Sequence, residues 1–151
     1  MKYSFKTGNI LGLVGGLVAV VGVFLPWMTA TETITNTSTS ASGISVPLFG
    51  ILVLLFSALG LVLVLVGKRG ACIGAMIMGI LAFVFGLIVA TVWSAIISTF
   101  GVGDILSIGY GLYMSLAGSI ILVIGSVLTL GELKQIAPQM APPPMFEQPM
   151  Q

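Results

Sequence analysis

Four stretches of the chain consist almost entirely of apolar residues, and the polar residues gather between them. The stretches run from 10 to 28, 46 to 66, 71 to 93 and 108 to 130. Each is long enough to cross the hydrocarbon core of a bilayer, which takes about 20 helical residues. None alternates polar and apolar positions as the strands of a membrane barrel do. The pattern therefore predicts an all-α protein, a four-helix transmembrane bundle.

The segments outside these stretches differ in character. Residues 29–45 contain ten Ser or Thr, and threonine occupies every odd position from Thr29 to Thr39. A period of two suits a short β-strand or hairpin with one threonine face, and a solvated connector is the alternative. Residues 131–151 are rich in Pro and Met, which is typical of an extended tail. We therefore divide the chain into a four-span membrane domain, 1–130, and a tail, 131–151.

Composition agrees with the span pattern. Hydrophobic residues make up 58% of the 151 residues and charged residues 6%, whereas an ordinary soluble domain has roughly 45–50% and 25%. So few charges cannot cover the surface of a soluble domain. We expect a multi-pass protein of the cell membrane, in contact with the lipid bilayer.

Charge placement predicts the orientation of the bundle. All five basic residues fall on one side of it: Lys2, Lys6, Lys68, Arg69 and Lys134. Because basic residues collect in cytoplasmic segments, we place both termini in the cytoplasm and the loop of residues 29–45 outside. Trp27, Trp93 and Tyr110 then lie near the outer interface, where aromatic side chains anchor membrane proteins.

The first stretch also has the basic and apolar regions of a secretory signal peptide, and cleavage would remove that span. A cleavage site needs small residues separated by one position. The best candidate, Ala30, has Met28 two residues before it. We therefore expect the first span to be retained.

Small residues recur at helical spacing within three of the four stretches. The glycines that we expect to pack helices together are Gly12, Gly16, Gly79, Gly86, Gly111, Gly118 and Gly125. Small side chains let helix backbones approach closely in lipid, where the hydrophobic effect does not drive association. We expect the first, third and fourth helices to pack tightly, and the second to keep a broad face toward lipid or a partner. The alternative is that these rows of small residues pack several copies of the chain together.

Residues that carry chemistry are scarce. The chain has no histidine and one cysteine, Cys72, which leaves no Cys/His nucleophile pair and no usual set of metal ligands. Ion-coupled transporters usually keep a charged residue inside a span. This chain has none there. The net charge of +1 includes no basic run for nucleic acid. We therefore predict no catalytic, cofactor or metal site, and no nucleic-acid partner.

A few polar residues have candidate roles. Asn36 begins an Asn-Thr-Ser sequon in the outer loop and is a candidate glycosylation site. Asp104 is a candidate cap or turn residue before the fourth helix, and a contact with a partner is the alternative. The serines inside the spans, such as Ser57 and Ser119, can each bond back to their own helix.

Two short motifs carry a resemblance. Gly22-Val23-Phe24-Leu25-Pro26-Trp27 ends the first stretch, and Gly109-Tyr110-Gly111-Leu112-Tyr113 opens the last. The layout and these motifs resemble small four-span prokaryotic and archaeal membrane proteins, whose function is mostly uncharacterised. The layout is also similar to claudin-like and tetraspan proteins. The chain lacks the extracellular cysteine pair and the Trp-Gly-Leu-Trp signature of claudins, so the resemblance implies no junctional function.

Together these observations predict an integral membrane scaffold or accessory subunit without catalysis. It would act through contacts with other membrane proteins or with copies of itself, made by the outer loop and the proline-rich tail. The alternative is a small channel or transporter formed by homo-oligomerisation. A membrane enzyme fits less well because no pair of ionisable residues is available for acid–base chemistry.

Overall fold

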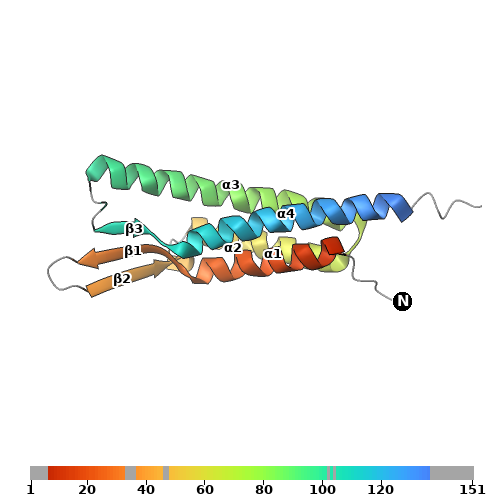
Figure 1. The fold of residues 1–151 in the computed structure, drawn as a ribbon, viewed down its shortest axis with the longest axis horizontal. Coiled ribbons are helices and arrows are strands. Elements are labelled where there is room, and N and C mark those ends of the chain that lie inside the picture. The colour runs from red at the N-terminus through yellow and green to blue at the C-terminus, as the bar shows by residue number, and fades with distance from the viewer. Residues whose placement is uncertain (1–6, 33–36, 46–47, 102, 104, 137–151) are drawn as a thin grey trace, which may run out of the picture.

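The computed structural model describes residues 7–32, 37–45, 48–101, 103 and 105–136. Its helices are α1 (Thr7–Phe24), α2 (Phe49–Val66), α3 (Arg69–Phe100) and α4 (Tyr110–Ile136), with strands β1 (Pro26–Glu32), β2 (Thr37–Ser42) and β3 (Leu106–Ile108) and a short 3₁₀ turn, η1 (Gly43–Ser45). All four helices are long and apolar enough to cross a membrane. The predicted four-helix fold with a strand pair in the first loop is confirmed (Figure 1). The chain is a multi-pass membrane protein.

The closest helix pair is α1 with α4, which run antiparallel. Their glycines alternate along the seam, so that each backbone lies against the other. A Cβ built on Gly15 would lie 2.7 Å from the carbonyl carbon of Ile121, and one on Gly22 would lie 2.9 Å from Ser115 Cα. Such contacts leave no room for a side chain, so the backbones themselves form this interface.

The other helices complete a ring in which α4 packs on α3, α3 on α2, and α2 on α1. The helices α2 and α3 are joined by a turn in which Gly67 adopts φ 65°, the left-handed conformation that ends α2. The expected tight group of the first, third and fourth helices is wrong, because the first and third are not neighbours. The second helix does keep an outward face, on which Ile51, Leu55 and Leu59 are exposed. The helices α1 and α3 lie diagonally across the bundle, and α2 packs on both of them.

Several predicted helix ends need correction. The first helix ends at Phe24 rather than at residue 28, because Pro26 has no N–H for the carbonyl of Gly22 and disfavours helical geometry at the residue before it. The indole N–H of Trp27 donates to that carbonyl instead, at 2.9 Å. The backbone then continues directly into β1.

The third helix continues past Trp93 to Phe100 and ends where Gly101 adopts φ 63°. At 1.5 Å per residue its 32 residues span about 48 Å, well beyond a hydrocarbon core of about 30 Å. Its last turns therefore leave the core and contact β3. The fourth helix starts at Tyr110 rather than at residue 108, because Leu106–Ile108 pair with β1 instead. It continues past residue 130 to Ile136, so residues 131–136 of the predicted extended tail are helical. The second helix starts at Phe49 rather than at residue 46.

The sheet is antiparallel, with strand order β2-β1-β3. Its third strand comes from the segment between α3 and α4 and was not predicted, although Leu106-Ser107-Ile108 alternates apolar and polar residues. The prediction that the threonines share a single face is also wrong. Thr31 pairs with Ser38 and Ala30 with Thr39, and residues paired across strands share a face. The threonines of β1 and β2 therefore lie on opposite faces.

The core has two apolar clusters. The one nearer the sheet contains Val23, Trp27, Val53, Val89 and Leu112. The other contains Val64, Ala75 and Leu122. Large apolar side chains such as Leu17, Leu59 and Ile77 remain exposed on the outside, where lipid surrounds the spans.

Buried hydroxyl groups line α4. Ser115, Ser119, Ser126 and Thr129 each donate to a carbonyl three or four residues earlier, as expected for serine and threonine within helices. Ser57 in α2 departs from that expectation. Its hydroxyl is fully buried and has no hydrogen-bond partner among the residues that the structure describes.

Candidate functional site

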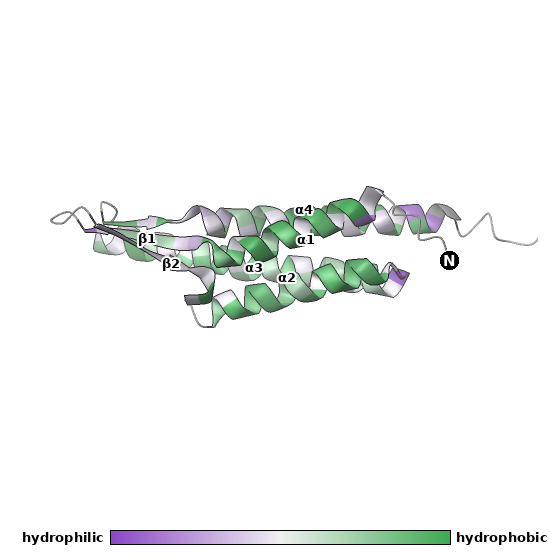
Figure 2. Ribbon diagram, turned by 90° about the horizontal axis from the view of Figure 1, so that it is seen from below, coloured by the Kyte–Doolittle hydropathy of each residue, from purple (hydrophilic) through white to green (hydrophobic). Residues whose placement is uncertain are grey.

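The two ends of the bundle are chemically different. Lys68 and Arg69 lie at the α2–α3 turn, and Lys134 lies near the end of α4. The sheet and the last turns of α3 lie at the opposite end (Figure 1). The helices between the two ends are predominantly apolar (Figure 2). Polar surface for contacts with other molecules is thus concentrated outside the span region.

The two sequence motifs meet where the sheet joins the bundle. The N–H of Gly109 donates to the carbonyl of Trp27 at 2.7 Å. A Cβ on Gly109 would lie 2.7 Å from the carbonyl carbon of Pro26, and one on Gly111 would lie 2.7 Å from the carbonyl oxygen of Leu25. The glycines are therefore required for a close backbone approach. The motifs form one structural unit, which fixes the sheet on the α1–α4 pair.

One face of the sheet is a row of hydroxyl groups. Thr29 pairs with Ser40 on one side and with Ser107 on the other. The hydroxyl oxygens of Thr29 and Ser107 are 2.5 Å apart and share a hydrogen bond. Thr31 and Ser38 add a second row on the same face. This face offers both donors and acceptors to water or to a partner.

The opposite face is apolar where β1 and β3 pair. Met28 lies opposite Ile108, and Ala30 lies opposite Leu106. Ile108 packs against the core cluster that contains Trp27, as does Trp93 of α3. The sheet is therefore held by apolar contacts on one face and leaves its hydroxyl face free.

The outer edge of the sheet is β2. Its residues pair with β1 on one side, and no segment of the described chain pairs with the other side. Residues Ser38 to Ser40 are exposed. An edge strand of this kind presents unpaired N–H and C=O groups to which another strand can be added.

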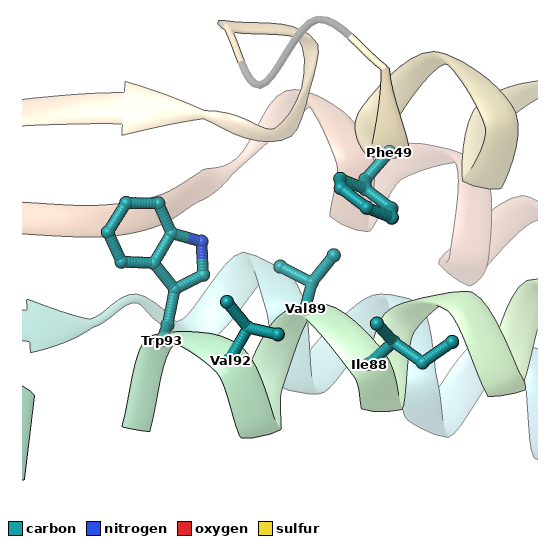
Figure 3. Close-up of a pocket in the computed structure, with 5 residues that line it drawn as sticks. All are labelled: Phe49, Ile88, Val89, Val92 and Trp93. Atoms are coloured by element: carbon teal, nitrogen blue, oxygen red, sulfur yellow. The ribbon is translucent and has the colours of Figure 1, made fainter. Parts of the chain in front are cut away.

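An apolar slot lies between the start of α2 and the last membrane turns of α3 (Figure 3). It is lined by Phe49, Ile88, Val89, Val92 and Trp93, and has a volume of about 190 Å³. A second slot of about 160 Å³ lies between α3 and α4, lined by Ile80, Phe83, Ile120, Val123 and Ile124.

The glycines predicted to pack helices are all buried. Gly111, Gly118 and Gly125 face the α1–α4 seam. Gly12 and Gly16 face Val64 and Leu61 of α2, and Gly79 and Gly86 face side chains of α4. The smallest clearances to backbone are found in the α1–α4 seam, whereas the α3 glycines meet side chains.

The predicted aromatic anchors have different surroundings. Trp27 is only 1% exposed, so its indole offers no surface to lipid headgroups. The ring is instead part of the apolar core. Trp93 is half-buried, and Tyr110 is exposed. Asn36 and Asp104 lie outside the described residues, as does most of the tail.

The third strand and the free β2 edge were missed at the sequence level. The alternation at 106–108 is only three residues long, and a strand this short is indistinguishable from loop without its partner. In the described part of the chain, no three His, Cys, Asp or Glu side chains gather to hold a metal ion. Comparison with known proteins adds no further assignment: no family model and no curated protein matches the chain.

Proposed function

We propose that the protein is an integral membrane scaffold or accessory subunit that binds a partner through its outer sheet. In this arrangement both termini lie on the cytoplasmic side of the cell membrane. The basic end formed by Lys68, Arg69 and Lys134 lies on the same side. The basic residues support that orientation because they collect on the cytoplasmic side of membrane proteins. The sheet then stands outside, where a partner can reach it.

The free β2 edge carries the proposal. Three consecutive exposed residues, Ser38 to Ser40, border an edge that no described segment covers. Strand addition uses main-chain hydrogen bonds for affinity and alternate side chains for specificity. The rigid attachment of the sheet to α1 and α4 supports this role, because an edge that is held in place loses less conformational entropy on binding.

A channel or transporter built from several copies is the competing function. Close helix association in lipid relies on small residues, and the predicted glycines are buried within the chain, against α1, α2 or α4. The outward surface carries Ile, Leu and Val instead. A ring of copies would therefore have to assemble without the small-residue stripes.

Adjacent proline substitutions in β2 test the proposed edge. Successive residues in a strand direct their N–H groups to opposite sides, so of Ser38→Pro and Thr39→Pro one removes a hydrogen bond to β1 and the other removes a donor from the free edge. Hydrogen exchange at β1 identifies which variant keeps the sheet. We expect that variant to lose a partner that co-purifies with the unmodified chain at fixed ratio from native membranes.

Two results would count against the proposal. One is a partner retained at the same ratio by the variant whose sheet is intact. The other is a particle in nanodiscs whose mass is a multiple of the chain alone, with a polar inner surface, which would favour the channel.

A further inference from the structure

We propose that the slot lined by Phe49, Ile88, Val89, Val92 and Trp93 holds one acyl chain of a membrane lipid, and that the indole N–H of Trp93 binds an oxygen at the glycerol end of that lipid. This site is separate from the β2 edge and does not depend on the protein partner.

The slot is continuous with the lipid-facing surface. Ile88 and Val92 line it and are also 41% and 50% exposed on the outside of the span. Both residues belong to α3, within a helix whose apolar window is long enough to cross the bilayer. The medium at its mouth is therefore hydrocarbon, and an apolar chain can enter directly from the bilayer.

The size of the slot suits part of a chain rather than a whole lipid. Its volume is about 190 Å³, and an apolar cavity of about 150 Å³ in another protein stays free of water and takes up benzene. An empty slot would leave its lining atoms without dispersion contacts on one side. A short run of methylene groups supplies those contacts.

Trp93 gives the slot a polar end. Its indole N–H has no hydrogen-bond partner in the described part of the chain, whereas the other indole, that of Trp27, donates to Gly22. The nitrogen-bearing edge of the Trp93 ring is turned toward Phe49 in the close-up (Figure 3). An indole N–H can only donate, so it requires an acceptor, and the oxygens at the glycerol end of a lipid are acceptors.

The height of Trp93 fits this pairing. Trp93 packs against the same cluster as Ile108 of β3, where the helices give way to the sheet, and tryptophan favours the level of the headgroups. A lipid oxygen at that height and a chain running down the slot belong to one molecule. The second slot, between α3 and α4, is lined only by Ile, Phe and Val and offers no donor, so it should hold exchanging lipid only.

Quenching of tryptophan fluorescence by a phosphatidylcholine with a dibrominated acyl chain tests the site in detergent. In the unmodified chain we expect quenching to saturate near one lipid per protein, because the bromine enters the slot beside Trp93. Trp93→Phe identifies the signal, since the remaining tryptophan, Trp27, is 1% exposed. Quenching that rises in proportion to the lipid fraction without saturation would overturn the proposal.

Two phenylalanine substitutions localise the bound chain. Val92→Phe fills the slot and should reduce the saturable quenching at least threefold. Val84→Phe adds the same ring to an equally outward position on α3, 43% exposed, and should leave quenching unchanged. Equal quenching in both variants would place the lipid elsewhere and overturn the proposal. If Val92→Phe does not fold, the saturation of quenching in the unmodified chain still decides whether one lipid is bound beside Trp93.

The hydrogen bond has its own readout. In native mass spectrometry, Trp93→Phe should retain phosphatidylcholine roughly three- to tenfold less well, as expected for one lost hydrogen bond. A brominated alkane, which has no acceptor oxygen, should compete poorly with the lipid for the unmodified chain. An alkane that competes as well as the lipid would overturn the role of the indole.

Discussion

Gly125 of α4 and Gly12 of α1 contact each other backbone to backbone, but the contact is asymmetric. A Cβ on Gly125 would lie 2.5 Å from the Cα of Gly12. A Cβ on Gly12 would instead point toward α2, with Val64 Cγ1 nearest at 3.2 Å. A backbone atom cannot move away without displacing the helix, whereas a valine side chain can shift slightly. The two glycines therefore differ in what they tolerate.

This asymmetry predicts that Gly125→Ala costs much more than Gly12→Ala. We expect Gly125→Ala to reduce the free energy of unfolding by about 3 kcal/mol or more, at the upper end for an inserted methyl group, and Gly12→Ala by about 1 kcal/mol. Unfolding followed by tryptophan fluorescence in mixed detergent and SDS micelles measures both.

Gly131→Ala is the matched control in α4. A Cβ at Gly131 meets nothing within 4 Å, so the change should be neutral or stabilise by up to about 1 kcal/mol through helix propensity. Equal costs at Gly125 and Gly12 would show that the seam is not the rigid contact described above.

The glycines of α3 have softer surroundings. A Cβ on Gly86 would lie 2.8 Å from Leu116 Cδ2, the far end of a flexible side chain. We expect Gly86→Ala to cost about 1 kcal/mol or less, and Gly86→Leu to cost about 1–3 kcal/mol because the larger side chain must displace α4. The same unfolding assay measures the pair, and Gly86→Leu with unchanged stability would mean that α3 and α4 do not depend on this contact.

Pro26 and Trp27 should be energetically coupled. Pro26 leaves the Gly22 carbonyl without its helical donor, and the Trp27 indole supplies one. Trp27→Phe therefore removes ring volume and leaves a buried acceptor unpaired, with an expected cost of about 2–4 kcal/mol. In a Pro26→Ala background the new N–H can bond the carbonyl, so the cost should fall by about 1 kcal/mol.

A double-mutant cycle over the two positions measures that coupling. Additive costs, with no coupling beyond about 0.3–0.5 kcal/mol, would contradict the role of the Trp27 indole as the replacement donor for the Gly22 carbonyl. Trp93→Phe serves as the control, because Trp93 is half-buried and bonds to no described residue.

The spans were predictable because each depends on about 20 consecutive residues, and the glycine stripes because a helix repeats its faces regularly. The end of α1 could have been predicted from Pro26 alone, since a proline removes one helical hydrogen bond. The partner of the freed carbonyl could not, because it depends on how Trp27 folds back.

The candidate site depends on pairings between distant segments. The faces of the threonines follow from the register of β1 with β2, and a shift by one residue turns a strand over. Ser107 becomes part of the hydroxyl face only because β3 returns beside β1. The slot near Trp93 requires α2 and α3 to be placed, since Phe49 and Val89 are 40 residues apart in the chain. Such relationships are absent from any local pattern.

Ser57 and Ser119 form the final test, because both hydroxyls are buried but only one is bonded. Ser119 donates to the carbonyl of Ser115 at 2.8 Å, whereas Ser57 has no partner among the described residues. An unpaired buried hydroxyl costs free energy, so Ser57→Ala should be neutral or stabilise by up to about 1 kcal/mol, and Ser119→Ala should destabilise by about 0.5–1 kcal/mol. The unfolding assay above compares them directly. A larger loss for Ser57→Ala than for Ser119→Ala would mean that the Ser57 hydroxyl has a partner, such as a bound water, which holds α2 in the bundle.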